Sequence, residues 1–184
     1  NEKTLGVTAL FASDAYDEGD IIIQKEVQIL YPLKIKDAIE MITPLYFNCL
    51  KFIVDELLKK ETLVSYNQNV RNVSYSLWRD KGDYIVDWCK DSAYIKRFVD
   101  AVGYPYCGAI SYIDKKIVKI IDVEIEEDIM IENRDVGKVV FQKDGFPIIV
   151  CGRGLLKLVK ALDENNNNIL PLKNFRTRFG DKNE

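Results

Sequence analysis

The most constraining feature of the sequence is an apolar stretch near its start that enters a carboxylate-rich turn and leaves it again. Val7 to Phe11 suits a buried strand, and residues 21–30 resume an apolar run that then alternates with polar side chains, as a second strand does. Between them, residues 13–19 hold three carboxylates and one glycine: Asp14, Asp17, Glu18 and Gly19. A glycine beside carboxylates lets the backbone turn sharply, with positive φ where needed, and leaves the acids at a strand end. On these residues alone, a solvated acidic loop is the stronger interpretation, and a ligand site at a strand end is the weaker.

The composition predicts a folded chain of one domain or two small ones. The 184 residues are 47% hydrophobic and 11% aromatic, which supplies a real core and excludes a disordered chain. Because no apolar run approaches the ~20 residues of a membrane span, no membrane partner is expected.

The cysteines argue against metal and disulfide frameworks. The sequence has no His and no Cys-x-x-Cys pair, so neither a zinc site nor a disulfide scaffold is expected. Each cysteine has apolar neighbours, which predicts small core residues in a reducing cytoplasm. The four are Cys49, Cys89, Cys107 and Cys151.

Charge is distributed unevenly but nowhere strongly basic. Residues 1–61 carry a net charge of −4 and residues 62–184 a net charge of +1. Neither half therefore has the basic surface that binding to a phosphate backbone usually needs.

Helical spacing predicts two consecutive helices over residues 35–60. Thr43 is a good N-cap and Pro44 is favoured at a first helical position, so the second helix is expected to begin there. The polar, weakly periodic residues 62–84 are typical of a linker.

The second half of the chain reads as one helix followed by strands. Asp91 is placed to cap a helix, and residues 109–162 contain five short strands with hairpin signals at Asp114–Lys116 and Lys143–Gly145. Five short strands with such turns predict a small barrel of the OB type. The final segment, 175–179, is expected to be a solvated last turn, with contact to a phosphate as the alternative.

The acidic turn resembles a motif of the folate-dependent formyltransferases. That family carries G-V-T, a short strand and then D-x-G-x-D-T-G-D-I, and here Gly6-Val7-Thr8 is followed by Ser13 to Ile21. The core from Asp17 to Ile21 is intact except at one position. The substituted residues are Ser13 for the first Asp, Ala15 for the first Gly and Glu18 for the Thr.

A second motif in the correct order resembles the same family. The family form is R-x-P-E-D-G-x-I-D-W, then a helix, then P-(Y/W)-P-G-A. The matching residues here are Arg79, Asp83, Asp87, Trp88 and the run Tyr104–Ala109, in which Cys107 replaces the second Pro. Together the two motifs extend the resemblance over nearly the whole chain.

The resemblance implies a fold class and a domain order. It implies an α/β fragment in residues 1–61, which is the end of a Rossmann-like formyltransferase domain. A linker in residues 62–84 and a small OB-like β-barrel domain in residues 85–184 are expected to follow.

The resemblance also implies an activity and a catalytic residue. Members transfer a formyl group from 10-formyltetrahydrofolate to a primary amine, and the family Asp at position 17 is catalytic together with an upstream Asn and His. Because this chain has no His, we expect the front half of the enzyme, including most of the folate pocket, to be absent from it. The chain alone is then expected to be inactive, and no metal is expected.

The charge of the second half of the chain decides which amine acceptor is expected. Methionyl-tRNA formyltransferases rely on a basic C-terminal domain, so the near-neutral second half favours an amino-sugar nucleotide as substrate, in the cytoplasm. Methionyl-tRNA as acceptor and a non-catalytic OB-type binding or dimerisation module, for instance in a homodimer, remain the alternatives.

Two further expectations concern the second motif. The Arg79 guanidinium is a candidate for binding a substrate phosphate, and an ion pair with Asp83 or Asp87 is the structural alternative. Trp88 and the pair Tyr104 and Tyr106 are expected to be core residues rather than a ligand platform.

Overall fold

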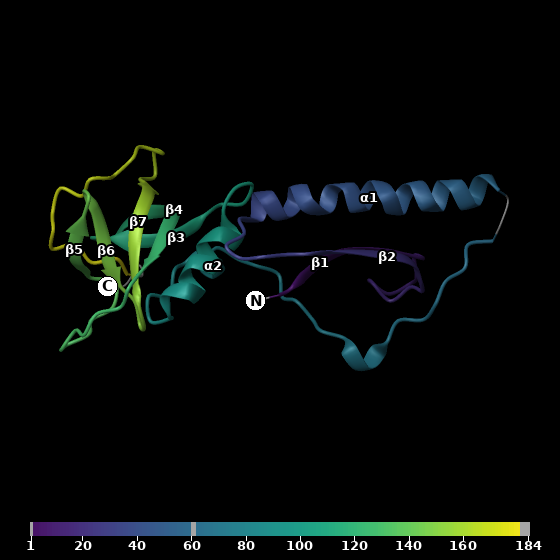
Figure 1. The fold of residues 1–184 in the computed structure, drawn as a ribbon, viewed down its shortest axis with the longest axis horizontal. Coiled ribbons are helices and arrows are strands. Elements are labelled where there is room, and N and C mark those ends of the chain that lie inside the picture. Colours follow the sequence, from purple (N-terminus) through teal and green to yellow (C-terminus); the bar gives the residue numbers. More distant parts are fainter. Residues whose placement is uncertain (1, 60–61, 181–184) are drawn as a thin grey trace. The chain divides into compact units, whose positions relative to one another are not determined.

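The computed structural model describes residues 2–59 and 62–180 (Figure 1). The chain forms two compact units, residues 1–78 and residues 79–184, referred to below as the N-terminal unit and the C-terminal unit. The expected functional division into a catalytic-domain piece, a linker and an OB-like domain stays a prediction.

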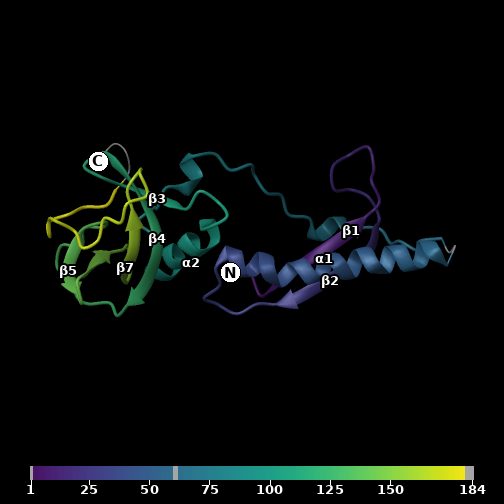
Figure 2. The same ribbon diagram turned by 90° about the horizontal axis from the view of Figure 1, so that it is seen from above.

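The N-terminal unit is a β-hairpin with one long helix on it. Strands β1 (Thr4–Leu10) and β2 (Ile21–Gln28) pair antiparallel, with Val7 opposite Lys25. Helix α1 (Ile35–Leu58) packs against both strands (Figures 1 and 2). The strands on either side of the acidic turn are therefore confirmed, whereas the Rossmann-like origin of this unit stays a prediction.

The prediction of two helices over residues 35–60 is wrong, because α1 runs through Pro44 without a break. Pro44 has no N–H to donate to the carbonyl of Glu40, which normally costs a helix about 3 kcal/mol. Both residues lie on the exposed side of α1, where water can reach the carbonyl. The Thr43 hydroxyl donates to the Ile39 carbonyl at 2.8 Å instead of capping a new helix.

In the C-terminal unit the predicted helix is confirmed as α2 (Ser92–Val102). The Asp91 carboxylate accepts a hydrogen bond from the Tyr94 backbone N–H at 2.6 Å, which satisfies one of the unpaired donors at the helix start. The buried side of α2, with Ile95 and Val99 each 1% exposed, packs mainly on β4.

Five antiparallel strands form the sheet of this unit, in the order β3-β4-β7-β6-β5. They are β3 (Ala109–Ile113), β4 (Lys116–Glu126), β5 (Val139–Lys143), β6 (Phe146–Val150) and β7 (Leu155–Leu162). Both predicted hairpins are present. Their two-residue turns are left-handed at both positions, with φ of 49° and 65° at Asp114 and Lys115 and of 53° and 82° at Asp144 and Gly145, the conformation that matches strand twist.

The end of the chain packs onto both edges of this sheet. Gly180 exchanges two backbone hydrogen bonds of 3.0 Å with Tyr112 in β3, and Thr177 accepts one of 3.0 Å from Val139 in β5. Phe179 is completely buried, and its ring centroid lies 5.7 Å from that of Trp88. The expectation of a solvated last turn is therefore wrong for Thr177 and Phe179, which are buried, whereas the other residues of 175–179 are exposed. Within the described residues β3 and β5 do not pair directly, so the sheet is open and the OB-like barrel is not confirmed.

The core of the C-terminal unit is extensive. Its buried residues come from the segment before α2, from α2, from every strand of the unit, from the residue after β6 and from the chain end: Val86, Trp88, Ile95, Val99, Val102, Ala109, Val118, Ile120, Val123, Val139, Ile149, Cys151, Leu156, Leu158, Ala161 and Phe179. Trp88 is thus a core residue, as expected. Tyr104 and Tyr106 are 77% and 53% exposed, which contradicts their expected burial.

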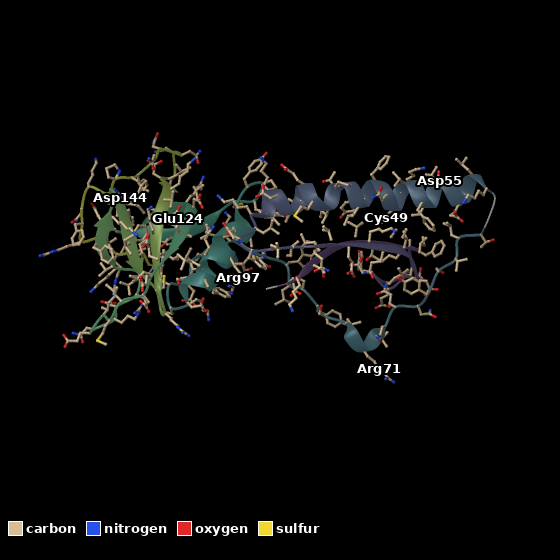
Figure 3. All side chains as sticks on the ribbon, in the orientation of Figure 1. Cys49, Asp55, Arg71, Arg97, Glu124 and Asp144 are labelled. Carbon is tan, nitrogen blue, oxygen red and sulfur yellow. The ribbon has the colours of Figure 1, made fainter. Side chains whose placement is uncertain are left out.

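The cysteines divide into two kinds. Cys49 and Cys151 are buried, as the sequence predicted, and burial raises the pKa of the Cys151 thiol to about 12. Figure 3 shows Cys49 on α1. The expectation is wrong for Cys89 and Cys107, which are exposed because they lie in the connections before and after α2 rather than on a strand or helix face.

Over residues 2–59 and 62–180, neither α1 nor any other helix is long and apolar enough to cross a bilayer.

Candidate functional site: the acidic loop

The acidic turn is a closed loop between β1 and β2 (Figure 2, purple). The Phe11 backbone N–H donates to the Asp20 carbonyl at 3.0 Å, which holds the two ends of the loop together. A Cβ atom at Gly19 would lie 1.6 Å from the Phe11 carbonyl oxygen, so no other residue fits there. The left-handed residue is Asp17, with φ of 60°, and not Gly19. The glycine is therefore needed for close approach of two backbone segments and not for positive φ.

A second segment, residues 66–68, lies along this loop and is called the strap below. Tyr66 and Ile21 exchange two backbone hydrogen bonds of 2.8 and 3.0 Å. The Asn67 side-chain amide donates to Asp20 Oδ1 at 2.8 Å. The Gln68 side-chain amide donates to the Asp17 carbonyl at 2.6 Å and to the Gly19 carbonyl at 2.8 Å. No local pattern indicated this role, because the strap lies in a polar stretch with weak periodicity and contacts a loop that is far away in the sequence.

These contacts give the carboxylates of the loop different environments. Asp20 is half-buried and its Oδ1 is the acceptor of the Asn67 bond, which gives this carboxylate a structural role. Asp14 and Asp17 are exposed. Asp17 differs from Asp14 because the strap holds the backbone carbonyl of Asp17. Of the two exposed aspartates, Asp17 is therefore the one whose backbone is held in place from outside the loop.

Arg79 lies at the start of the C-terminal unit, whereas Asp17 lies in the N-terminal unit. Arg79 is exposed, and both carboxylates proposed as its ion-pair partners have other contacts. Asp83 Oδ2 accepts from the Asp80 backbone N–H at 2.8 Å. Asp87 accepts from the Cys89 backbone N–H at 2.9 Å and lies 3.7 Å from the Lys90 ammonium. The described contacts thus give no support to the ion-pair alternative for Arg79.

In the C-terminal unit, Asp128 and Arg134 form a charge pair that is also hydrogen-bonded to the backbone. One Arg134 amino group donates to Asp128 Oδ1 at 2.8 Å and to the Gly154 carbonyl at 2.7 Å, and Nε donates to the Cys151 carbonyl at 2.8 Å. The hydrogen bond from Arg134 lowers the pKa of the Asp128 carboxyl below its usual value. This pair fastens the loop between β4 and β5 to the turn before β7, which is a structural task.

Comparisons with known proteins show which family the chain belongs to and which solved structures share its fold. The profile of the family described as "Formyl transferase, C-terminal domain" matches residues 79–180. A methionyl-tRNA formyltransferase of Syntrophomonas wolfei is 26% identical over 162 residues, which cover 86% of this chain and 49% of that protein.

Two solved structures share the fold. HypX from Aquifex aeolicus, in complex with tetrahydrofolic acid, superposes with a TM-score of 0.63 at 20% identity and covers 92% of this chain and 29% of its own. The N-formyltransferase from Helicobacter canadensis, in complex with folinic acid and dTDP-3-aminofucose, has a TM-score of 0.57 at 21% identity and covers 85% of this chain and 56% of its own. At such identities the likeness concerns the fold alone.

The chain belongs to the folate-dependent formyltransferase family and corresponds to its C-terminal part, as the two sequence motifs predicted. It spans about half the length of the curated relatives it matches.

Proposed function

We propose that the full-length protein transfers a formyl group from 10-formyltetrahydrofolate to the primary amine of an amino-sugar nucleotide in the cytoplasm. The observation that carries the choice of acceptor is the charge of the C-terminal unit, in which acidic and basic residues are equal in number over 79–184. A domain that holds tRNA through its phosphates releases counterions from many Lys and Arg contacts, and this balance does not favour such a surface. A nucleotide sugar needs only a few charged contacts.

In this proposal Asp17 is the catalytic residue of the chain. The amine nitrogen attacks the formyl carbon, the carbonyl oxygen becomes an oxyanion, and collapse of the tetrahedral intermediate breaks the bond to N10 of the folate. The attacking amine must lose a proton and N10 must gain one. An exposed carboxylate at Asp17 can accept the proton that the amine loses, either directly or through water. It can alternatively hold a histidine from elsewhere in the protein in the required tautomer.

Arg79 is proposed to bind a phosphate of the nucleotide. Its exposed guanidinium presents paired donors that match two phosphate oxygens, and the described contacts assign it to neither neighbouring carboxylate. An OB-like arrangement of the C-terminal unit belongs to the same proposal. It is supported by the chain end, which hydrogen-bonds to β3 at Tyr112 and to β5 at Val139.

Methionyl-tRNA is the second candidate acceptor, because the curated relatives with sequence similarity carry the name methionyl-tRNA formyltransferase. The two candidates differ in salt dependence. We expect the full-length protein to bind a nucleotide sugar more tightly than tRNA in titrations at about 150 mM salt. Tight tRNA binding whose affinity falls steeply with salt would establish the second candidate instead.

The Asp17→Asn variant tests the catalytic residue. It keeps the size of the side chain and removes its charge, so we expect turnover by the full-length enzyme to fall about 100-fold or more with little change in substrate affinity. Asp14→Asn is the matched control, since Asp14 is another exposed aspartate of the same loop, and its turnover should stay within about a factor of three. Equal turnover of Asp17→Asn and wild type would refute the assignment.

A further inference from the structure

We infer that Gln68 is a positioning residue for Asp17, acting from the strap through the backbone of the acidic loop. The inference rests on the proposed function. Its basis is that one half-buried side-chain amide donates to two carbonyls of the loop, that of Asp17 at 2.6 Å and that of Gly19 at 2.8 Å.

The backbone of Asp17 is in a conformation that contacts from elsewhere in the unit help to hold. With φ of 60° it is in the left-handed region, which an aspartate tolerates better than most residues but which is still less favourable than the right-handed region. Two points of the loop, with only Glu18 between them, are held by other segments. The Gln68 amide holds the Asp17 carbonyl, and Gly19 lies against the Phe11 carbonyl.

The direction of the Asp17 carboxylate follows from this backbone. The side chain is exposed, so packing does not orient it, and the torsions of its own backbone set where it leaves the loop. A displacement of about 1 Å at a reacting group costs on the order of 100-fold in rate. Loss of the Gln68 bonds therefore lowers turnover without removing any group that touches the substrate.

The strap itself is held independently of Gln68. Tyr66 pairs with Ile21 through two backbone hydrogen bonds, and Asn67 donates to the Asp20 carboxylate. A substitution at Gln68 consequently removes the contact to Asp17 and Gly19 while the neighbouring residues keep the strap in place. The contribution of the Gln68 side chain to holding the acidic loop can therefore be measured by itself.

The experiment compares Gln68→Met with Gln24→Met in the full-length enzyme. Methionine keeps the length of the side chain and removes the amide donors. Gln24 is the matched control because its amide also donates one hydrogen bond in the hairpin, to Thr8 Oγ1 at 2.8 Å, but between the paired strands and not to the loop. We expect kcat to fall about 10-fold or more in Gln68→Met with KM within about a factor of three, and neither to change in Gln24→Met.

A double variant separates positioning from general destabilisation. If Gln68 acts through Asp17, adding Gln68→Met to Asp17→Asn lowers kcat by less than about twofold further, because the group being positioned no longer functions. Multiplicative effects of the two substitutions would overturn the inference. So would an unchanged kcat in Gln68→Met.

A second readout does not depend on activity. In this chain, amide hydrogen exchange over residues 12–20 should quicken in Gln68→Met and stay unchanged in Gln24→Met. Unchanged exchange in Gln68→Met would overturn the inference. Gln68→Glu, which keeps the shape but replaces donors with acceptors, serves if Gln68→Met does not fold, with the same expected results.

The two proposals can fail separately. A wild-type enzyme without formyltransferase activity on either acceptor counts against the proposed function and against the inference that rests on it. An active wild type with a fully active Gln68→Met variant counts against the inference alone.

Discussion

The two units of the chain differ in how they bury apolar side chains. The C-terminal unit has a continuous core that draws on α2, five strands and Phe179. In the described part of the N-terminal unit the buried apolar residues are few: Val7, Ile29, Ala38 and Cys49. Meanwhile one side of α1 exposes large apolar side chains over more than three turns: Tyr46, Phe47, Leu50, Val54, Leu57 and Leu58. Since burial of apolar surface is the main favourable term in folding, the C-terminal unit should supply most of the stability of the chain.

The largest expected effect is on the separated units. A fragment of residues 79–184 should fold and unfold cooperatively, because its core is complete within those residues. A fragment of residues 1–78 should show helix by circular dichroism but no cooperative thermal transition, because it buries too little apolar surface to offset its chain entropy. A sharp transition in residues 1–78 would contradict the comparison.

A pair of identical substitutions sharpens the same contrast. Leu158 is completely buried in β7 and Leu50 is 60% exposed on α1. Leu158→Ala should lower the free energy of unfolding by about 2–5 kcal/mol, since it removes buried methyl groups and leaves a cavity. Leu50→Ala should change it by no more than about 0.5 kcal/mol. Urea unfolding of the two variants in this chain measures both, and equal losses would show that the Leu50 face is buried in solution.

The smallest expected effect is on how the stability of the C-terminal unit depends on pH. Arg134 lowers the folded-state pKa of the Asp128 carboxyl below its usual value of 3.8, so the ion pair stabilises the folded state above that value. The contribution is lost as pH falls through the lowered folded-state pKa. For so exposed a pair it should amount to less than about 1 kcal/mol.

The Asp128→Asn variant measures the contribution of this ion pair to stability. Its free energy of unfolding should lie below that of wild type at pH 7, and the difference should shrink as the pH is lowered from about 4. Glu164→Gln is the control, because Glu164 is an exposed carboxylate just after the end of β7. Its free energy of unfolding should match that of wild type across the pH range. A difference that grows on acidification would contradict the assigned sign.

Much of the local structure was predictable because the signals lie within a few residues of one another. Asp91 caps α2 through a bond to Tyr94, three residues on. The hairpin at Asp144 and Gly145 follows from two residues that tolerate positive φ between apolar strands. The two motifs that indicated the family, at Asp17 and at Arg79–Trp88, likewise consist of residues that are close together in the sequence.

Other features depended on partners far along the chain, and only the tertiary structure decided them. Pro44 stays inside one helix because its side of α1 is exposed, whereas its local signal with Thr43 favoured a new helix. Phe179 is buried because the chain end returns to β3 and β5, which no local pattern announces.

The same division runs through the candidate site. The sequence by itself determined that carboxylates and a glycine would gather between two strands, because alternation and turn chemistry are local properties. It did not reveal that Gly19 is required for contact with Phe11, or that Gln68 would hold the Asp17 carbonyl. Both depend on the approach of backbone segments that are separate in sequence, and such approach is decided by packing and hydrogen bonding of the whole unit.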